Sequence, residues 1–169
     1  FILNMANKFI QEKFSEDCLL TIAIPTFKRP KLLYAALKSV IEQSYKGEYE
    51  IVVVDNCIEK EFINKVDIVV NSLSALKKIN LYRNQSNLGM FGNWNQCLTK
   101  ARGKYISILN DDDLLDYKFV ENVIKDINKS KMLIYNYQIL SEKNKVEKIG
   151  GNLRAFLSKI NIIRKKEIS

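Results

Sequence analysis

The chain has 169 residues, of which 47% are hydrophobic and 27% are charged, and its formal net charge is +8. These proportions exclude a disordered chain, and the length suits one folded domain with a substantial core. The chain has no histidine and three widely spaced cysteines, which exclude a zinc site of the usual Cys/His spacing and any His-based catalytic triad. We expect the cysteines to be small buried side chains in a reducing compartment.

Alternating strands and helices are predicted along the chain from its hydrophobic pattern. After a lead-in at 1–17, which includes a short amphipathic helix at 5–14, strands are expected at 18–24, 50–56, 79–83, 105–109 and 132–140. Helices are expected at 30–43, 61–76, 93–101 and 117–129, with a polar loop at 84–92. The segment 146–149 is expected to pair with 132–140 as a hairpin across 141–145, and 153–168 to form a basic amphipathic helix.

This alternation predicts an α/β domain with a mainly parallel central sheet flanked by helices. In such sheets, ligands bind beyond the carboxyl ends of the strands. Polar clusters follow three of the predicted strands, at 25–29, 55–56 and 110–113. Their expected convergence indicates a ligand site at that edge of the sheet.

The most unusual cluster is Asn110 followed by three consecutive aspartates, Asp111, Asp112 and Asp113. Adjacent carboxylates repel one another, so a compensating positive charge is needed. One aspartate could cap the helix that follows, but three exceed what capping requires. Hard carboxylate oxygens suit Mg²⁺ or Mn²⁺. A metal- or phosphate-related role and simple helix capping both remain open at this point.

The glycine pattern argues against two common nucleotide-binding classes. The chain contains neither G-x-G-x-x-G nor G-x-x-x-x-G-K-[ST], which disfavours a Rossmann dehydrogenase and a P-loop NTPase. The predicted rim instead offers an aromatic ring at Phe27, a guanidinium at Arg29, and the amides and carboxylates of the polar clusters. These groups suit a nucleotide whose diphosphate is neutralised by a cation.

Four motifs together resemble the family 2 glycosyltransferases of the GT-A fold. In chain order they are LTIAIPTF at 20–27, EIVVVDN at 50–56, NLGM at 87–90 with NWN at 93–95, and GKYI at 103–106 continuing to LNDDD at 109–113. The resemblance covers about residues 18–140. It implies a nucleotide-diphospho-sugar transferase architecture, a nucleotide-sugar-binding core at 18–141, a UDP- or dTDP-linked donor, and Mn²⁺ or Mg²⁺.

The resemblance also implies roles for the residues that contact the nucleotide. Pro25 and Phe27 would line the base pocket, with Arg29 nearby, and Thr26 would belong to the nucleotide-sugar site. The base would be hydrogen-bonded by Asp55 and Asn56. The other side of the nucleotide would be closed by Asn87 and Gly89, with Asn95 supporting that loop.

The acid run carries the remaining implied roles. The Asp-x-Asp motif of the family fits either Asp111-x-Asp113 or Asn110-x-Asp112 followed by Asp113, and we favour the second register. Asp111 would then reach the ribose, Asn110 would belong to the nucleotide-sugar site, and Asp112 and Asp113 would hold the metal.

Several of these residues also have a plainer explanation. Phe27 and Trp94 could be ordinary rim or core aromatics. Arg29 could be a surface charge before a helix, and Asn87 and Asn95 could be turn and cap residues.

The implied function is metal-dependent transfer of a sugar, of the hexosyltransferase type, to a cell-surface glycan or lipid-linked acceptor, as in bacterial polysaccharide biosynthesis. No residue after 141 is identified as the acceptor-side base, so we expect 142–169 to lead into a missing or truncated acceptor half. Two alternatives remain. One is a nucleotide-binding fragment or pseudoenzyme without transfer activity, and the other is a metal-dependent phosphotransfer or nucleic-acid enzyme.

Partners and location are predicted from charge and hydropathy. No window approaches the roughly 20 apolar residues of a membrane span, and the opening Phe1-Ile2-Leu3 is too short for a secretory signal, so we expect a cytoplasmic protein. The segment 142–169 carries eight Lys or Arg against three Glu. It suits peripheral contact with the anionic inner face of a membrane, although a solvated lysine-rich surface is the simpler explanation. No nucleic acid is expected, because the basic residues are not interleaved with aromatics.

Overall fold

The computed structural model describes residues 18–127, 132–133, 138–140, 146–149 and 162–164. Its strands are β1 (Leu20–Thr26), β2 (Glu50–Asp55), β3 (Ile79–Arg83), β4 (Tyr105–Ile108), β5 (Met132–Leu133), β6 (Gln138–Leu140), β7 (Val146–Ile149) and β8 (Ile162–Arg164). Its helices are α2 (Pro30–Ile41), α3 (Lys60–Ser74), α4 (Gly89–Lys100) and α5 (Phe119–Asp126).

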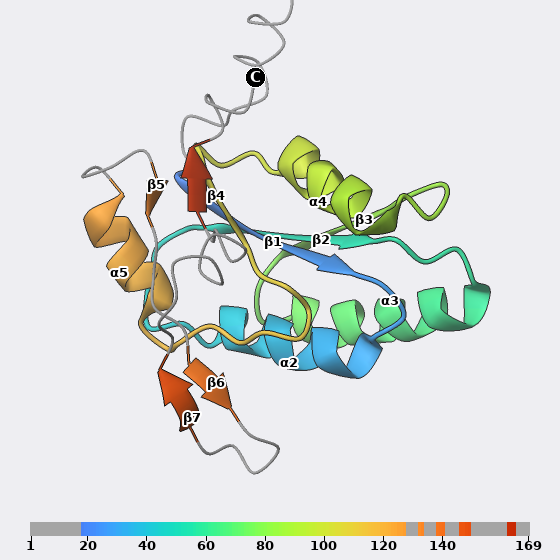
Figure 1. Cartoon of the computed structure of the whole chain (residues 1–169), viewed down its shortest axis with the longest axis horizontal. Helices are drawn as coiled ribbons and strands as arrows, with labels where there is room; N and C mark the ends of the chain where they lie inside the picture. Colours follow the sequence, from blue (N-terminus) through green and yellow to red (C-terminus); the bar gives the residue numbers. More distant parts are fainter. Residues whose placement is uncertain (1–17, 128–131, 134–137, 141–145, 150–161, 165–169) are drawn as a thin grey trace, which may run out of the picture.

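The central sheet has the strand order β3-β2-β1-β4-β8-β5. The four strands β1 to β4 pair in parallel, whereas β8 runs antiparallel to both β4 and β5. Helices α2 and α3 lie along one face of this sheet and α4 lies on the other (Figure 1). The predicted α/β domain with a mainly parallel sheet is therefore confirmed.

Helices cover both faces of the sheet, which explains why the inner strands are continuous hydrophobic runs. Every residue of β1 and of β2 is buried, as expected for parallel strands between two layers of helices. Side chains that alternate along these strands belong to two separate hydrophobic cores. Ile22, Ile24 and Val53 pack with the buried residues of α2, α3 and α5, whereas Ala23 and Val52 pack with those of α4. These two cores fix the sheet, and with it the positions of the strand ends.

The start of α4 differs from the prediction. The helix begins at Gly89, four residues earlier than expected. Gly89 has a φ of +69°, a conformation that glycine adopts without steric cost, and its N–H donates to Asn87 Oδ1 at 2.9 Å. The side chain of Asn87 thus forms the turn from which the helix starts.

The C-terminal elements also differ from the prediction. The strand expected at 132–140 is divided into β5 and β6, which belong to different sheets. The hairpin is confirmed, because β6 pairs antiparallel with β7. Residues 162–164, expected in a helix, form β8 between β4 and β5. Pairing with distant strands overrides the local pattern there. The helix expected at 5–14, and the rest of the one expected at 153–168, lie outside the described residues.

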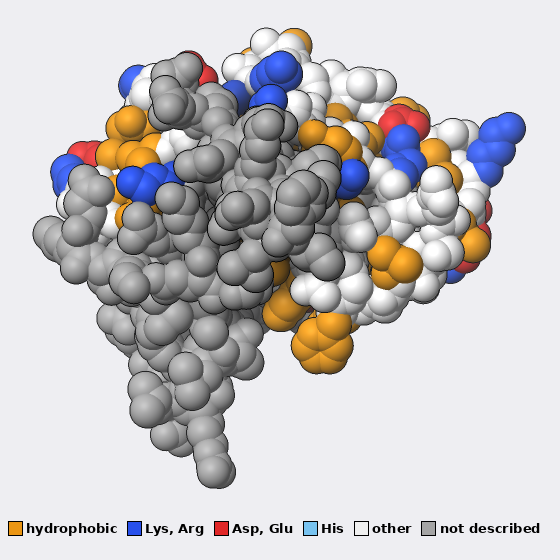
Figure 2. All heavy atoms as spheres, turned by 90° about the horizontal axis from the view of Figure 1, so that it is seen from above, with side chains coloured by type: hydrophobic (Ala, Val, Ile, Leu, Met, Phe, Trp, Pro, Cys, Tyr) orange, Lys and Arg blue, Asp and Glu red, His pale blue; other side chains and the backbone are white. Residues whose placement is uncertain are grey.

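The described surface carries apolar as well as charged side chains. At the start of α4, Leu88, Met90 and Phe91 are exposed. Seen from above, hydrophobic side chains are interspersed with basic and uncharged ones (Figure 2). None of the helices in the described part of the chain combines the length and apolar character needed to cross a lipid bilayer.

Candidate functional site

The carboxyl ends of β1, β2 and β4 bring three polar residues of the predicted site together. Thr26 and Asp55 are register partners at the ends of β1 and β2. Thr26 Oγ1 donates to Asp111 Oδ2 at 2.7 Å, although the two residues are 85 positions apart. The polar clusters that follow separate strands therefore meet at one edge of the sheet.

Asp111 is a buried carboxylate at the centre of this edge. Its side chain has no exposed surface, and Oδ1 lies 2.5 Å from a terminal nitrogen of Arg29 in an ion pair without hydrogen-bond geometry. Burial raises the pKa of Asp111, against the opposing effects of the Thr26 hydrogen bond and the Arg29 charge.

The other acids of the run point elsewhere. Asp112 is half-exposed, and its Oδ2 accepts a hydrogen bond from Arg29 at 3.0 Å. Asp113 turns back toward Asn110, whose Nδ2 donates to Asp113 Oδ2 at 3.1 Å. Arg29 is thus paired with two of the three aspartates rather than being an isolated surface charge.

Asp55 holds a second buried carboxylate at the same edge. Its Oδ1 accepts the backbone N–H of Cys57 at 3.0 Å. Its Oδ2 is buried and has no hydrogen-bond partner among the described residues, with Arg83 Nε 3.5 Å away. Burial raises the pKa of Asp55, opposed by the Cys57 N–H and the Arg83 charge. A buried acceptor without a hydrogen-bond donor is costly, and here the charge of Arg83 offsets only part of that cost.

Asn56 differs from the prediction because its side chain is already fully hydrogen-bonded. Its Nδ2 donates to Asn87 Oδ1 at 2.7 Å and to the Gly89 carbonyl at 3.3 Å. Its Oδ1 accepts from Asn84 Nδ2 and from the Leu88 N–H, both at 2.9 Å. An amide offers two donors and two acceptor sites, so none is left for a base. Asn56 therefore holds the loop before α4 in place.

Asn93, rather than the predicted Asn95, supports that loop from beneath. Asn93 is buried, its Oδ1 accepts from Asn84 Nδ2 at 3.0 Å, and its Nδ2 donates to the Val54 carbonyl at 3.2 Å. Asn95 is exposed on α4. Asn93, Cys97 and Ala101 are all buried and follow one another at intervals of four residues, so they lie on one side of α4. The sequence shows this spacing, and it would have predicted a buried Asn93 had the helix been expected to begin at Gly89.

The loop after β1 forms the exposed rim of the site. Pro25 is buried in β1, whereas the Phe27 side chain is partly exposed. Lys28 has a φ of +57°, forms an ion pair with Glu59, and lies 5.1 Å from the centre of the Phe27 ring. This ion pair ties the loops after β1 and β2 together beside Asp55.

Asp112 and Asp113 are the predicted metal ligands. The described residues contain no group of three or more His, Cys, Asp or Glu side chains arranged to hold a metal. Mg²⁺ commonly binds through only one or two carboxylates, with substrate phosphates and water as its other ligands. Asp112 and Asp113 offer oxygen donors of the type that Mg²⁺ prefers, but in this structure Asp112 faces Arg29 and Asp113 faces Asn110.

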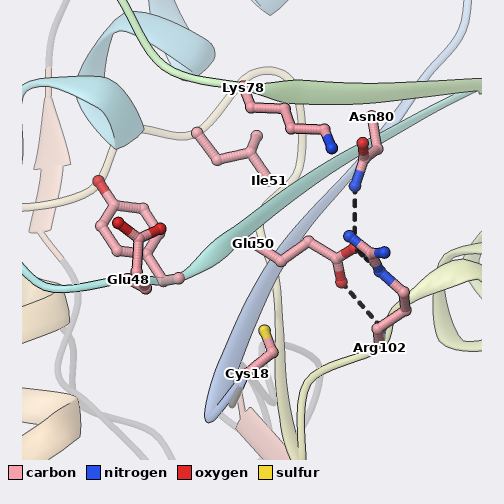
Figure 3. Close-up of a pocket in the computed structure, with 8 residues that line it drawn as sticks. Cys18, Glu48, Glu50, Ile51, Lys78, Asn80 and Arg102 are labelled. Carbon is pink, nitrogen blue, oxygen red and sulfur yellow. Dashed lines mark hydrogen bonds and ion pairs between the residues drawn. The ribbon is translucent and has the colours of Figure 1, made fainter. Parts of the chain in front are cut away.

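A separate hollow of about 250 Å³ lies at the opposite, amino-terminal edge of the sheet (Figure 3). Its floor is the buried carboxylate of Glu50, which accepts hydrogen bonds from Thr21 Oγ1 at 2.7 Å, Asn80 Nδ2 at 2.9 Å, and both the N–H and Nε of Arg102 at 2.8 and 2.7 Å. Burial raises the pKa of Glu50, but these hydrogen bonds outweigh burial and leave it lowered. Every Glu50 oxygen is satisfied, so this network is a structural tie between strands.

Comparison with known proteins decides the family. The model of the family described as "Glycosyl transferase family 2" matches residues 21–168. The chain belongs to glycosyl transferase family 2. The match runs past residue 141, so the predicted division of the chain at that position stays a prediction.

Curated relatives of this family 2 chain carry glycosyltransferase names. It is 29% identical over 129 residues to "Uncharacterized glycosyltransferase MJ1057" of Methanocaldococcus jannaschii, covering 75% of this chain and 43% of that protein. It is 27% identical over 130 residues to the "GalNAc(5)-diNAcBac-PP-undecaprenol beta-1,3-glucosyltransferase" of Campylobacter jejuni, covering 76% and 41%. The chain spans less than half the length of these relatives.

Solved structures confirm the GT-A fold of the family 2 chain. The S. aureus TarS 1–349 structure in complex with UDP matches with a TM-score of 0.70 and 20% identity, over 87% of this chain and 47% of that one. The mannosyltransferase PcManGT from Pyrobaculum calidifontis, in complex with GDP-Man and Mn²⁺, matches with a TM-score of 0.59 and 19% identity, over 76% and 40%.

Proposed function

We propose that this chain binds the nucleotide of a UDP- or dTDP-linked sugar at the carboxyl edge of its sheet, for metal-dependent transfer of the sugar to a glycan or lipid-linked acceptor. One observation carries the proposal: the same edge buries two carboxylates, and one oxygen of each, Asp55 Oδ2 and Asp111 Oδ1, makes no hydrogen bond among the described residues and is balanced only by an arginine 3.5 or 2.5 Å away. Burying a carboxylate oxygen without a hydrogen bond costs free energy, and functional sites are where such groups are commonly found.

Each group at this edge has a role in the proposal. Asp55 Oδ2 accepts an N–H of the base, and Phe27 offers its ring at the rim. Asp111 accepts a ribose hydroxyl. Asp112 and Asp113 hold the cation, which supplies Lewis-acid stabilisation of the departing diphosphate when it is bound.

Solved structures with a similar fold, and one curated relative, support the donor class, the metal and the acceptor class. TarS has been crystallised with UDP and with UDP-GlcNAc, and PcManGT with GDP-Man and Mn²⁺. The Campylobacter relative is named as a glucosyltransferase acting on an undecaprenol-linked glycan. A lipid-linked acceptor at the inner face of a membrane, reached by a cytoplasmic protein in peripheral contact, is the matching proposal for this chain.

A second candidate is a nucleotide-binding module without transfer activity. It is favoured by the fact that the groups described at the carboxyl edge all suit the donor, and none of them has been assigned as the base toward an acceptor. A metal-dependent phosphotransfer or nucleic-acid enzyme has no comparable support, since the family match concerns glycosyl transfer.

The proposal is tested by calorimetric titration of the chain with UDP in the presence of Mn²⁺. Asp55→Asn removes the charged acceptor for the base and should weaken UDP binding by about 10- to 100-fold, the usual range for losing a hydrogen bond to a charged group. Asp116→Asn, which removes one exposed carboxylate from the same chain, should leave the affinity unchanged. The proposal would be wrong if the wild type did not bind UDP, or if both variants bound it with equal affinity.

A further inference from the structure

The guanidinium of Arg29 lies between two carboxylates of the acid run. One terminal nitrogen is 2.5 Å from Asp111 Oδ1 and the other donates to Asp112 Oδ2 at 3.0 Å. These are its partners in the described part of the chain. Arg29 comes from the loop that follows β1, immediately before α2, so the two ion pairs join positions 82 and 83 residues apart. The contact is therefore a specific product of the fold.

The exposure of the three groups differs, and this decides what the contact can do. The Asp111 side chain is fully buried, whereas those of Arg29 and Asp112 are 47% and 49% exposed. A pair of half-exposed groups adds little to stability and exchanges readily with water. The Arg29–Asp112 contact can consequently open without loss of the fold, while Asp111 retains a positive charge beside it.

The position of Arg29 conflicts with a second cation on Asp112. The same Oδ2 that accepts the guanidinium hydrogen bond is one of the carboxylate oxygens that a divalent ion would use. Two positive charges a few ångströms apart repel strongly at a partly buried site. A metal ion and the guanidinium therefore compete for Asp112.

We propose that Arg29 is a built-in counter-cation for Asp111 and Asp112, which a divalent metal must displace from Asp112 in order to bind. This inference rests on the proposed function, because it takes Asp112 as a metal ligand. Without nucleotide, the guanidinium offsets one of the negative charges of the acid run and lowers its affinity for free metal. The metal then binds tightly only when a diphosphate contributes further ligands and negative charge. Arg29 would thus make metal binding depend on the donor.

The test is to measure Mn²⁺ binding in the absence of nucleotide, with the electron paramagnetic resonance signal of free Mn²⁺ as the readout. Arg29→Gln keeps a polar side chain but removes the charge, and it should raise the affinity for Mn²⁺ by at least about fivefold, within the usual range of coupling between two ligands. Lys31→Gln removes the same charge from an exposed position two residues away and should change the affinity by less than about twofold because solvent and salt screen it.

Two further measurements separate the possible results. Adding Asp112→Asn to Arg29→Gln should abolish the gain, which assigns it to Asp112, and thermal unfolding reports whether either variant remains folded. Equal or weaker Mn²⁺ binding by Arg29→Gln, including no binding by any variant, overturns the role of Arg29. Titration of the wild type with UDP in the presence of Mn²⁺ decides the other question, because its failure would count against the proposed nucleotide site itself.

Discussion

At the scale of single residues, Asp111 is a buried carboxylate that costs the fold stability. Burial raises the pKa of this carboxyl group above its usual range, so the folded chain holds the proton more tightly than the unfolded chain. The ionised form present at neutral pH is therefore destabilising, and stability contributed by this group declines as pH rises through the interval between the unfolded and folded pKa values. Removing the charge of Asp111 should restore the lost free energy of unfolding.

We expect Asp111→Asn to raise the free energy of unfolding at pH 7 by about 0.5–2 kcal/mol, the common size of a stabilising substitution at a functional site. Denaturant titration measures this gain, and UDP titration should show weaker binding by the same variant. The gain should vanish below the unfolded pKa, where the wild-type carboxyl is protonated in both states. A variant that is less stable than the wild type at pH 7 would contradict this account of Asp111.

At the scale of elements, the loop before α4 depends on a partly buried chain of asparagine amides. Asn56, Asn84 and Asn93 are linked by successive side-chain hydrogen bonds of 2.9 and 3.0 Å, and Asn93 anchors the chain to the Val54 carbonyl of β2. Buried polar networks of this kind hold a loop firmly only while every member is satisfied. The loop that carries Asn87 should therefore loosen when the anchor is removed.

Asn93→Ala should lower the free energy of unfolding by about 1–3 kcal/mol, the cost of leaving buried partners unpaired. Amide hydrogen exchange in 84–89 should accelerate at the same time. Asn95→Ala is the matched control, because Asn95 lies exposed two residues away on the same helix and should change stability by no more than about 0.5 kcal/mol. Equal effects of the two variants would show that Asn93 has no special role.

Some of these elements are predicted correctly from the sequence and others are not, and the difference has a physical cause. The inner strands and helices of 18–127 follow from local hydrophobic period, because β1 and β2 are buried on both faces and α2, α3 and α5 bury one stripe each. The start of α4 depends on a turn made by the Asn87 side chain, which hydrophobic period does not report. The strand β8 exists through pairing with β4 and β5, so its local amphipathic pattern is misleading.

The site residues divide in the same way. The position of Asp55 and Asp111 after inner strands places them at the carboxyl edge, and this follows from topology alone. The saturation of Asn56 and the role of Asn93 depend on contacts with residues 28 to 39 positions away, which no local motif encodes. The four hydrogen bonds that Glu50 accepts at the amino edge were missed for the same reason.

At the scale of the whole molecule, the two edges of one sheet serve different purposes. The amino edge is tied together by Glu50, whose carboxylate oxygens are fully hydrogen-bonded. The carboxyl edge instead gathers charged groups that are incompletely paired among the described residues. This contrast supports the proposal that the carboxyl edge, rather than the amino edge, binds a cation and with it the diphosphate of a nucleotide.

The most direct test of this division is to locate bound metal and nucleotide by nuclear magnetic resonance. Paramagnetic Mn²⁺ broadens the signals of nearby nuclei, so it marks its own position in the presence of UDP. We predict selective broadening of the backbone amide signals of Thr26 and of 110–113, with those of Glu50, Asn80 and Arg102 at the amino edge remaining sharp. Broadening centred on the amino edge, or spread evenly over the chain, would contradict a nucleotide site at the carboxyl ends of the strands.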